Sequence, residues 1–454
     1  MPFLFYSKEQ AALIRTLVKW VILGCWAGVV SGAASAVFLL ALDAATRYRE
    51  ANPWLLCLLP VCGILIYFAY SRYGKDVEAG NNLLLETVHN PEATIPFRMA
   101  PMVLISTVAT HLFGGSAGRE GTAVQMGASL ANLARGPLKL SAADHRILVM
   151  SGISGGFGSV FGTPLAGTVF GLEVLTIGRM SYEAIIPCFV ASVVGDIVCR
   201  SLGVVHHKYP TVLTAEPSLK TWVLIVISGA LFAGAAALFG ELTHQITQLT
   251  KKHLPRPWMR PVVGGLAVIG LAWALGTRAY LGLSLPLIAQ SFTPQGVPTG
   301  AFLLKILFTA ITLGTGFKGG EVTPLFCIGA TLGAAFAHFT HQPIELFAAL
   351  GFVAVFAGAA NTPLACAVMG IELFGHHIAS PLMAACIVSY ILSGHRGIYL
   401  SQRIHTPKSQ SIKVAQGVQL RETRIGIDTS ILTRRGRKMW PQQVDKDQNQ
   451  KDQQ

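Results

Sequence analysis

The sequence predicts an all-α membrane protein that crosses the bilayer many times and contains an internal repeat. Of its 454 residues, 52% are hydrophobic and only 13% are charged. Soluble domains carry about 25% charged residues, and a charge inside a bilayer is costly. The segments 20–42, 54–71 and 221–240 contain no charged residue. Each is close to the ~20 apolar residues that a spanning helix needs. Other apolar segments are shorter and interrupted by Gly or Pro, which predicts several broken helices.

The first apolar stretch follows a basic segment that contains Lys8, Arg15 and Lys19. A basic flank followed by a full-length apolar helix is typical of an ordinary first span rather than a cleaved signal peptide. Positive flanks favour the cytoplasmic side. We therefore expect residues 1–19 to form a cytoplasmic N-terminal segment.

The end of the chain is polar and basic. From Ser401 onward it holds 11 Lys/Arg and 5 Asp/Glu, within a chain of net charge +13. A segment of this composition is expected to be a disordered cytoplasmic tail close to anionic lipid. Nothing else in the sequence indicates nucleic-acid binding.

Two motifs occur twice, in the same order and at nearly the same spacing. Residues 161–173 and 360–372 share seven of thirteen positions, and aligning Thr163 with Thr362 gives an offset of 199. Aligning Glu120 with Glu321 gives an offset of 201. The alternative, chance similarity between Gly- and Ala-rich helices, does not account for two motifs with one offset. Repeats in membrane proteins usually place a transport pathway at their interface.

The repeat and the apolar pattern define the expected organisation of the chain. The segments are an N-terminal segment at 1–19, membrane repeat 1 at 20–200, a connector at 201–220, membrane repeat 2 at 221–400, and a cytoplasmic tail at 401–454.

Three Gly-rich breaks carry ionisable or polar residues, at 78–83, 114–122 and 314–324. Each precedes a stretch that is compatible with a helix. The first N–H groups of a helix have no partner within it and carry the positive end of its dipole. Several such ends that converge would bind an anion without a full positive charge. The alternative is that these glycines serve only close helix packing.

Glu120 is the most informative residue because it lies in a Gly-rich break between apolar segments. A carboxylate inside the membrane is a candidate functional group. When ionised it would itself occupy an anion site, and when protonated it would leave that site to a transported anion, which couples protons to anions. The alternative is an ion pair with Arg119, which is disfavoured because adjacent helical residues seldom face one another.

Glu173 and Glu372 hold equivalent positions in the repeat, each nine residues after a proline. A shared structural role, such as capping a neighbouring helix end, is favoured over a role in transport. The sequence contains no arrangement of residues typical of a catalytic, metal or nucleotide site. We therefore predict no enzymatic activity, no metal and no cofactor.

These motifs resemble those of the CLC family of anion channels and anion/proton antiporters. The resemblance covers roughly 20–400 and rests on Gly118–Thr122, Gly320–Pro324, 161–173 and Tyr399. It implies a CLC-type fold of many tilted and broken helices in two inverted halves. It also implies a homodimer with one pore in each subunit, in a bacterial inner membrane.

The resemblance also implies the site residues. Glu120 corresponds to the gate that couples protons to anions, and Tyr399 to the residue on the inner side of the site. The full predicted anion-binding set is Gly80, Asn81, Asn82, Gly118, Arg119, Gly121, Gly320, Glu321, Val322, Thr323 and Tyr399.

Three departures from the chloride-type pattern are present. Asn81 follows Gly80 where a serine is usual, Thr122 replaces a proline, and Val174 stands where chloride exchangers have an inner glutamate. The Gly-Asn-Asn-Leu and Glu-Val-Thr-Pro segments look like the fluoride-exporting branch. The resemblance therefore implies fluoride/proton antiport, and Asn81 would offer an amide donor to the ion. The alternatives are a chloride channel or chloride/proton exchanger on the same fold and, from another class, a membrane-embedded enzyme or assembly subunit.

Overall fold

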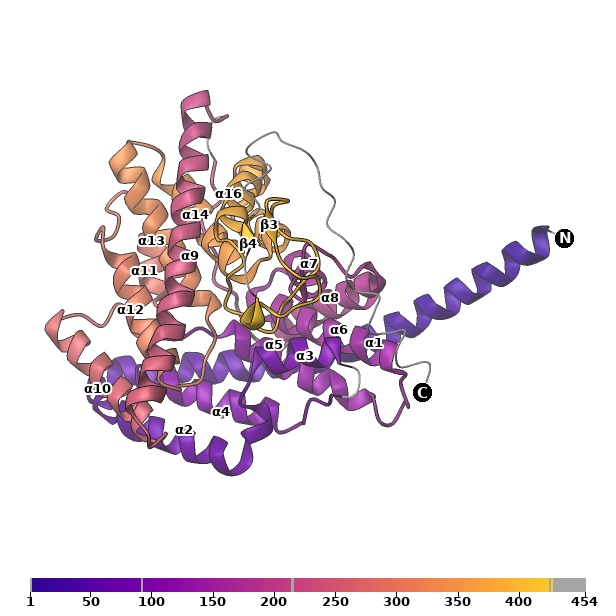
Figure 1. The fold of residues 1–454 in the computed structure, drawn as a ribbon, viewed down its shortest axis with the longest axis horizontal. Coiled ribbons are helices and arrows are strands. Elements are labelled where there is room, and N and C mark those ends of the chain that lie inside the picture. Colours follow the sequence, from indigo (N-terminus) through magenta and orange to yellow (C-terminus); the bar gives the residue numbers. More distant parts are fainter. Residues whose placement is uncertain (1, 91–92, 214–215, 424–425, 428–454) are drawn as a thin grey trace.

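The computed structural model describes residues 2–90, 93–213, 216–423 and 426–427. Its helices lie at many different angles, and α1 crosses the view of Figure 1 almost at right angles to α9. The helices of the first half are α1 (Pro2–Ala51), α2 (Leu59–Tyr73), α3 (Asn81–His89), α4 (Met99–Leu112), α5 (Glu120–Ala131), α6 (Ala142–Phe161), α7 (Pro164–Glu173) and α8 (Ile185–Ser201).

The second half repeats this order of elements. Its helices are α9 (Leu219–His253), α10 (Met259–Ala274), α11 (Leu285–Gln290), α12 (Ala301–Gly314), α13 (Val322–Thr340), α14 (Ile344–Ala360), α15 (Pro363–Phe374) and α16 (Ala379–Leu392). The short 3₁₀ helices are η1 (Pro53–Leu58), η2 (Lys75–Val77), η3 (Asn132–Ala134), η4 (Tyr182–Ala184), η5 (His376–Ile378) and η6 (Leu420–Glu422).

Four two-residue strands complete the described structure: β1 (Thr176–Ile177), β2 (Arg403–Ile404), β3 (Ile412–Lys413) and β4 (Gly426–Ile427). Strand β1 pairs with β2 in parallel, and β3 pairs with β4 in antiparallel fashion.

Five described segments are long and apolar enough to cross a membrane: Lys8–Ala51, Pro53–Tyr73, Tyr182–Ser201, Leu219–His253 and Val322–Thr340. Several other apolar helices are shorter, with 10–17 residues. Helix α7 has 10 residues, which is about 15 Å of helix, or roughly half of the apolar layer. The chain therefore stops and restarts inside the membrane, as the Gly and Pro interruptions predict.

The N-terminal segment is continuous with the first span. Helix α1 runs without a break from Pro2 to Ala51, so position 19 marks no structural boundary. The N-terminal part of α1 projects away from the other helices (Figure 1).

The repeated Thr-Pro motif marks the same joint in both halves. Helix α6 ends at Gly162, with φ of 73°, and α14 ends at Asn361, with φ of 58°. Gly and Asn are the residues that most readily adopt this left-handed conformation at a helix C-terminus. Pro164 and Pro363 then occupy the first turn of the next helix, where a missing N–H costs nothing.

Glu173 and Glu372 cap each other's helices, which confirms the structural role predicted for them. The Glu173 carboxylate accepts hydrogen bonds from the N–H groups of Leu364 at 3.1 Å and Ala365 at 2.8 Å. The Glu372 carboxylate accepts from Leu165 at 2.9 Å and Ala166 at 2.8 Å. The end of α7 thus meets the start of α15, and the end of α15 meets the start of α7. These two equivalent helices are antiparallel, as inverted halves require.

Glycines outside the three breaks serve close helix packing. This is the alternative role that we considered for the glycines within the breaks. A Cβ atom on Gly329 or Gly333 of α13 would lie 1.9 Å from a carbonyl oxygen of α14, that of Gly351 or Phe347 respectively. Only glycine permits these two backbones to approach so closely.

The beginning of the C-terminal tail is ordered, so the prediction of disorder is wrong for residues 401–423. The Gln402 side chain is fully buried and donates hydrogen bonds to the carbonyl oxygens of Val174 and Ala360, both at 2.8 Å. Strand β2 pairs with β1 just after α7. The tail thereby ties the two halves together, since Val174 and Ala360 belong to different repeats. Residues 428–454 of the predicted tail lie outside the described residues.

Candidate anion site

The second and third breaks are joined directly through their backbones. The Gly118 N–H donates to the Gly320 carbonyl oxygen at 2.6 Å, and the Gly320 N–H donates to the Gly118 carbonyl oxygen at 2.8 Å. This antiparallel bridge brings together the residues that precede α5 and α13. The two helices therefore begin beside each other, one from each half of the chain.

The first break joins them at Gly121. A Cβ atom on Gly121 would lie 2.9 Å from the Asn81 amide nitrogen and 3.3 Å from the Gly320 Cα. The three breaks therefore meet at one point, and a larger residue at 121 would displace the Asn81 side chain from it. Gly80, which precedes α3, has a φ of 56°, a conformation that strongly favours glycine. The close approach of Gly121 to Asn81 and Gly320 could not be predicted from the spacing of the breaks in the sequence.

Glu120 lies at the centre of this arrangement and is completely buried. One carboxylate oxygen, Oε2, accepts the backbone N–H of Thr323 at 3.0 Å and that of Arg119 at 3.1 Å. The other, Oε1, accepts the Thr323 hydroxyl. These donors belong to the starts of α5 and α13, so the carboxylate occupies a place where amides from both halves bind negative charge.

The Arg119 side chain is also close to this carboxylate, contrary to the expectation from its sequence position. Its Nε atom lies 3.5 Å from Glu120 Oε1. Arg119 precedes the first helical residue of α5, so the rule against neighbouring helical residues does not apply to it. The ion pair and the Thr323 hydrogen bonds coexist on one carboxylate.

One side of the site opens into a cavity of about 180 Å³, which we call the inner cavity. Its lining includes these predicted residues: Gly80, Asn81, Asn82, Glu321 and Tyr399. Within the described residues, the Asn81 Oδ1 atom is buried without a hydrogen-bond partner. The Asn82 Oδ1 atom instead accepts the Ser401 N–H at 3.0 Å, so this side chain also anchors the tail.

The other predicted residues do not line the inner cavity. Gly118, Gly121, Gly320 and Thr323 make the contacts around Glu120 described above, and Val322 is buried with 1% of its surface exposed. Arg119 faces a different cavity of about 410 Å³, which we call the Arg119 cavity. Arg49 and Arg278 also line it.

Four polar side chains of the inner cavity were not among the predicted site residues: Tyr70, Glu78, Gln125 and Lys318. The Gln125 amide nitrogen would lie 3.1 Å from a Cβ atom on Gly80. A local signal was present for three of them. Glu78 and Lys318 lie within the first and third breaks, and Gln125 follows Glu120 by five residues on α5.

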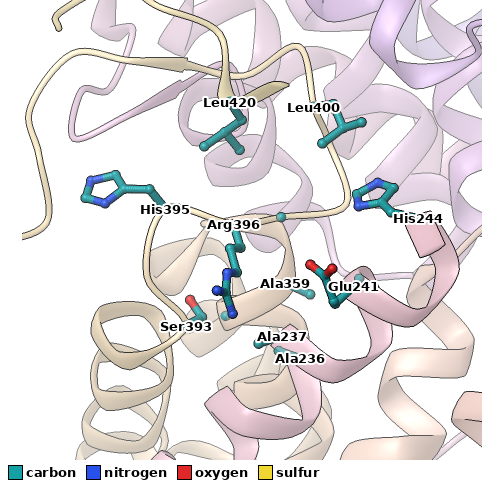
Figure 2. Close-up of a pocket in the computed structure, with 13 residues that line it drawn as sticks. Ala236, Ala237, Glu241, His244, Ala359, Ser393, His395, Arg396, Leu400 and Leu420 are labelled. Atoms are coloured by element: carbon teal, nitrogen blue, oxygen red, sulfur yellow. The ribbon is translucent and has the colours of Figure 1, made fainter. Parts of the chain in front are cut away.

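A further cavity, of about 120 Å³, lies beside the segment that leads to Tyr399 and is drawn in Figure 2. Glu241 of α9 and Arg396 are among the residues that line it (Figure 2). No predicted site residue lines this cavity, so it is separate from the place where the breaks meet.

The fold and this convergence of interrupted helices around a buried carboxylate define a membrane transporter of anions. The sequence model of the voltage gated chloride channel family matches residues 62–394. The chain belongs to this family, whose members are also called CLC proteins, and is an integral membrane protein of the CLC anion-transport type.

Individual relatives refine the comparison. A chloride/fluoride channel protein of Pseudomonas syringae pv. tomato is 48% identical over 422 residues, covering 90% of this chain and 93% of the relative. The crystal structure of a CLC-type fluoride/proton antiporter superposes with a TM-score of 0.83 at 35% identity, covering 86% of this chain and 98% of that chain. A slow cyanobacterial Cl⁻/H⁺ antiporter shares the fold, with a TM-score of 0.72 at 20% identity over 85% of this chain and 96% of that chain.

Proposed function

We propose that the protein exports fluoride in exchange for protons, with Glu120 as the group that couples the two. The observation that carries this proposal is the position of the Glu120 carboxylate, which accepts the Thr323 N–H at 3.0 Å and is fully buried. A negatively charged oxygen there stands in for the transported anion, because both need the same amide donors.

Protonation supplies the coupling step in this proposal. A protonated carboxyl is neutral and binds helix N-termini less strongly than a carboxylate does. The backbone N–H groups released from Glu120 then donate hydrogen bonds to the anion, while the protonated Glu120 side chain carries one proton. When the anion leaves, the ionised carboxylate returns to the same donors. One group thus alternates with the ion that it exchanges for a proton.

The side of the membrane that each cavity faces follows from the orientation that we propose for the first two spans. The basic N-terminal flank places the start of α1 in the cytoplasm, so Arg49 near its end is external. Helix α2 follows after the short η1 and returns, so Tyr70 in its last turn is cytoplasmic. The Arg119 cavity, which Arg49 lines, is then external, and the inner cavity, which Tyr70 lines, is cytoplasmic.

The choice of fluoride rests on Asn81 and the Glu321–Pro324 segment, and on the antiporter that is 35% identical. The competing function is chloride transport, as a channel or proton exchanger. The family supports that alternative, and so does the wording "chloride/fluoride" for the 48% identical relative. We further propose that the protein is a homodimer of a bacterial inner membrane and has no enzymatic activity.

The test is a flux measurement on the purified protein in liposomes. Vesicles loaded with fluoride or chloride are diluted into anion-free buffer, and anion release and proton uptake are recorded together. We expect fluoride release that drives proton uptake, and slower chloride release. Chloride release as fast as that of fluoride would favour the competing function. Absence of both fluxes would contradict anion transport by this chain.

A further inference from the structure

A second cavity, of about 450 Å³, lies beside the inner cavity. We call this one the vestibule. The two cavities have three lining residues in common, Tyr70, Glu78 and Lys318. We call these three residues, which border both the vestibule and the inner cavity, the neck.

The Lys318 ammonium lies in this neck. Its Nζ atom is 4.4 Å from the centre of the Tyr70 ring and 3.5 Å from the Glu78 carbonyl oxygen. An ammonium has three N–H donors, and these two contacts are a cation–π contact and one long hydrogen bond. Within the part of the chain that the structure describes, no ion pair joins Lys318 to a carboxylate. The Lys318 ammonium therefore retains N–H groups that can donate hydrogen bonds to an anion.

The charges of the vestibule have the same sign as Lys318. Lys75 and Arg260 line it, and Glu78 is the only acidic residue among its lining residues. An excess of positive charge in a concave surface raises the local concentration of anions and the rate at which they arrive. The sign of the vestibule is therefore suited to collecting the ion that the inner cavity receives.

Lys318 gives the neck a full positive charge, which the predicted site residues of the inner cavity do not have. A small anion such as fluoride is strongly hydrated, and its passage from the vestibule into the inner cavity requires compensation for lost water. A point charge on a flexible stem supplies this compensation. Because Lys318 is only half-buried, its charge is partly screened by water, so an ion is released more readily than from a fully buried cation.

We propose that Lys318 is an anion-capture residue, which binds a small hydrated anion at the cytoplasmic neck and delivers it to the inner cavity. This proposal rests on the proposed function for the direction of transport. It assigns Lys318 to substrate entry and not to proton coupling, which belongs to Glu120.

The first test is K318Q in liposomes, with fluoride flux measured as a function of fluoride concentration on the vestibule side. We expect the fluoride concentration for half-maximal flux to rise about tenfold, because focused positive charge raises the rate of anion arrival by at least about that factor. The maximal flux and the number of protons moved per fluoride stay unchanged. K318R retains the charge and is expected to stay close to the wild type. The control is K251Q, at an exposed lysine in the last turn of α9.

The second test restores the charge chemically. K318C is made together with C57S, because Cys57 is an exposed native cysteine. Treatment with an aminoethyl methanethiosulfonate is expected to lower the half-maximal fluoride concentration again. A sulfonatoethyl reagent of the same reach adds a negative charge and is expected to raise it further.

An unchanged half-maximal concentration in K318Q, or equal effects of the two reagents, would overturn the role of Lys318. If K318Q does not fold, K318R and the reagent-treated K318C decide instead. Wild-type protein that moves fluoride without protons would instead contradict the proposed function. The two failures are therefore distinguishable.

Discussion

Three carboxylates of this protein accept N–H groups at helix starts, yet they lie in two different settings. Glu173 and Glu372 each bind two consecutive N–H groups of a single helix, at 2.8–3.1 Å. Glu120 binds N–H groups from two different helix starts, one in each half of the chain. The first arrangement is a fixed cap. The second is a junction that an incoming anion can share.

The difference shows that a buried carboxylate on a helix N-terminus is not by itself a transport group. What distinguishes Glu120 is the meeting of three breaks around it, next to a cavity that contains Asn81 and Tyr399. The paired caps hold α7 and α15 together through four hydrogen bonds, and both carboxylates are used in that structural contact. The following experiments test this contrast, from the largest expected effect to the smallest.

The largest effect is expected for E120Q. A glutamine cannot exchange a proton, so proton uptake driven by fluoride should fall to the level of protein-free liposomes while fluoride still moves. E173Q serves as the matched control and should keep its proton uptake. Coupling that survives in E120Q would remove Glu120 from its proposed role.

G121A is expected to displace the Asn81 amide from the point where the three breaks meet. The new methyl group would lie 2.9 Å from the Asn81 amide nitrogen and 3.3 Å from Gly320 Cα. Overpacking of this kind costs about 1–3 kcal/mol, and fluoride flux should fall roughly tenfold. G136A is the control, because a Cβ atom there has no neighbour within 4 Å. Flux that is unaltered in G121A would show that the contact is not needed.

E173Q and E372Q should lower stability and leave coupling intact. Each change removes the charge from a cap that accepts two hydrogen bonds, and bonds to charged groups contribute about 1.5–3 kcal/mol. Thermal unfolding in detergent should therefore shift downward in both variants. A loss of proton coupling at normal stability would mean that the caps belong to the transport machinery.

N81S should change which ion the junction prefers. A serine hydroxyl at this position lies farther from Gly121 than the Asn81 amide does, so discrimination against chloride is expected to weaken several-fold. The measurement is the ratio of fluoride flux to chloride flux in the same vesicles. An unchanged ratio would leave Asn81 outside the selectivity determinants.

The smallest effect concerns a cation at a helix C-terminus, the opposite of the carboxylate caps. Lys408 of the tail donates to the Tyr390 carbonyl oxygen at 2.6 Å and to the Ser393 hydroxyl at 3.1 Å. Burial lowers the pKa of Lys408 to about 7, from 10.5. The unfolded chain therefore binds more protons than the folded one between those two values, and stability should rise with pH across that range.

This pH dependence is measured as the difference in thermal unfolding between wild type and K408M at pH 7 and pH 9. The stability of the wild type relative to the variant should increase at the higher pH. Folding removes a proton from Lys408, and this removal costs less free energy at pH 9 than at pH 7. An equal difference at both values would contradict the lowered pKa.

Much of the fold was predictable because it depends on short-range features. Apolar segments identified the long spans, and the offsets of about 200 residues identified the two halves. The capping role of Glu173 and Glu372 followed from their equivalent positions, and the hydrogen bonds to Leu364 and Ala166 confirm it. The ordered tail was missed, since its composition is that of a disordered segment and only the buried Gln402 reveals its anchor.

The candidate site was predictable in part. The three breaks were identified, and the structure brings Gly80, Asn81, Glu321 and Tyr399 to one cavity. The Arg119–Glu120 ion pair was disfavoured because both residues were assumed to be helical, whereas Arg119 precedes the helix. Lys318 lies within the third break, but the role that we propose for it could not be predicted, because it depends on Tyr70, which is 248 positions away in the chain.

The sequence by itself determined the chemistry that each segment brings: apolar spans, Gly-rich helix starts, and a carboxylate in a break. Residue type and local spacing are enough for this, because backbone amides and glycine behave in the same way wherever they occur. Only the tertiary structure decided which helix starts each carboxylate binds. Glu120 and Thr323 are 203 residues apart, and their contact depends on how two whole halves of the chain pack against each other.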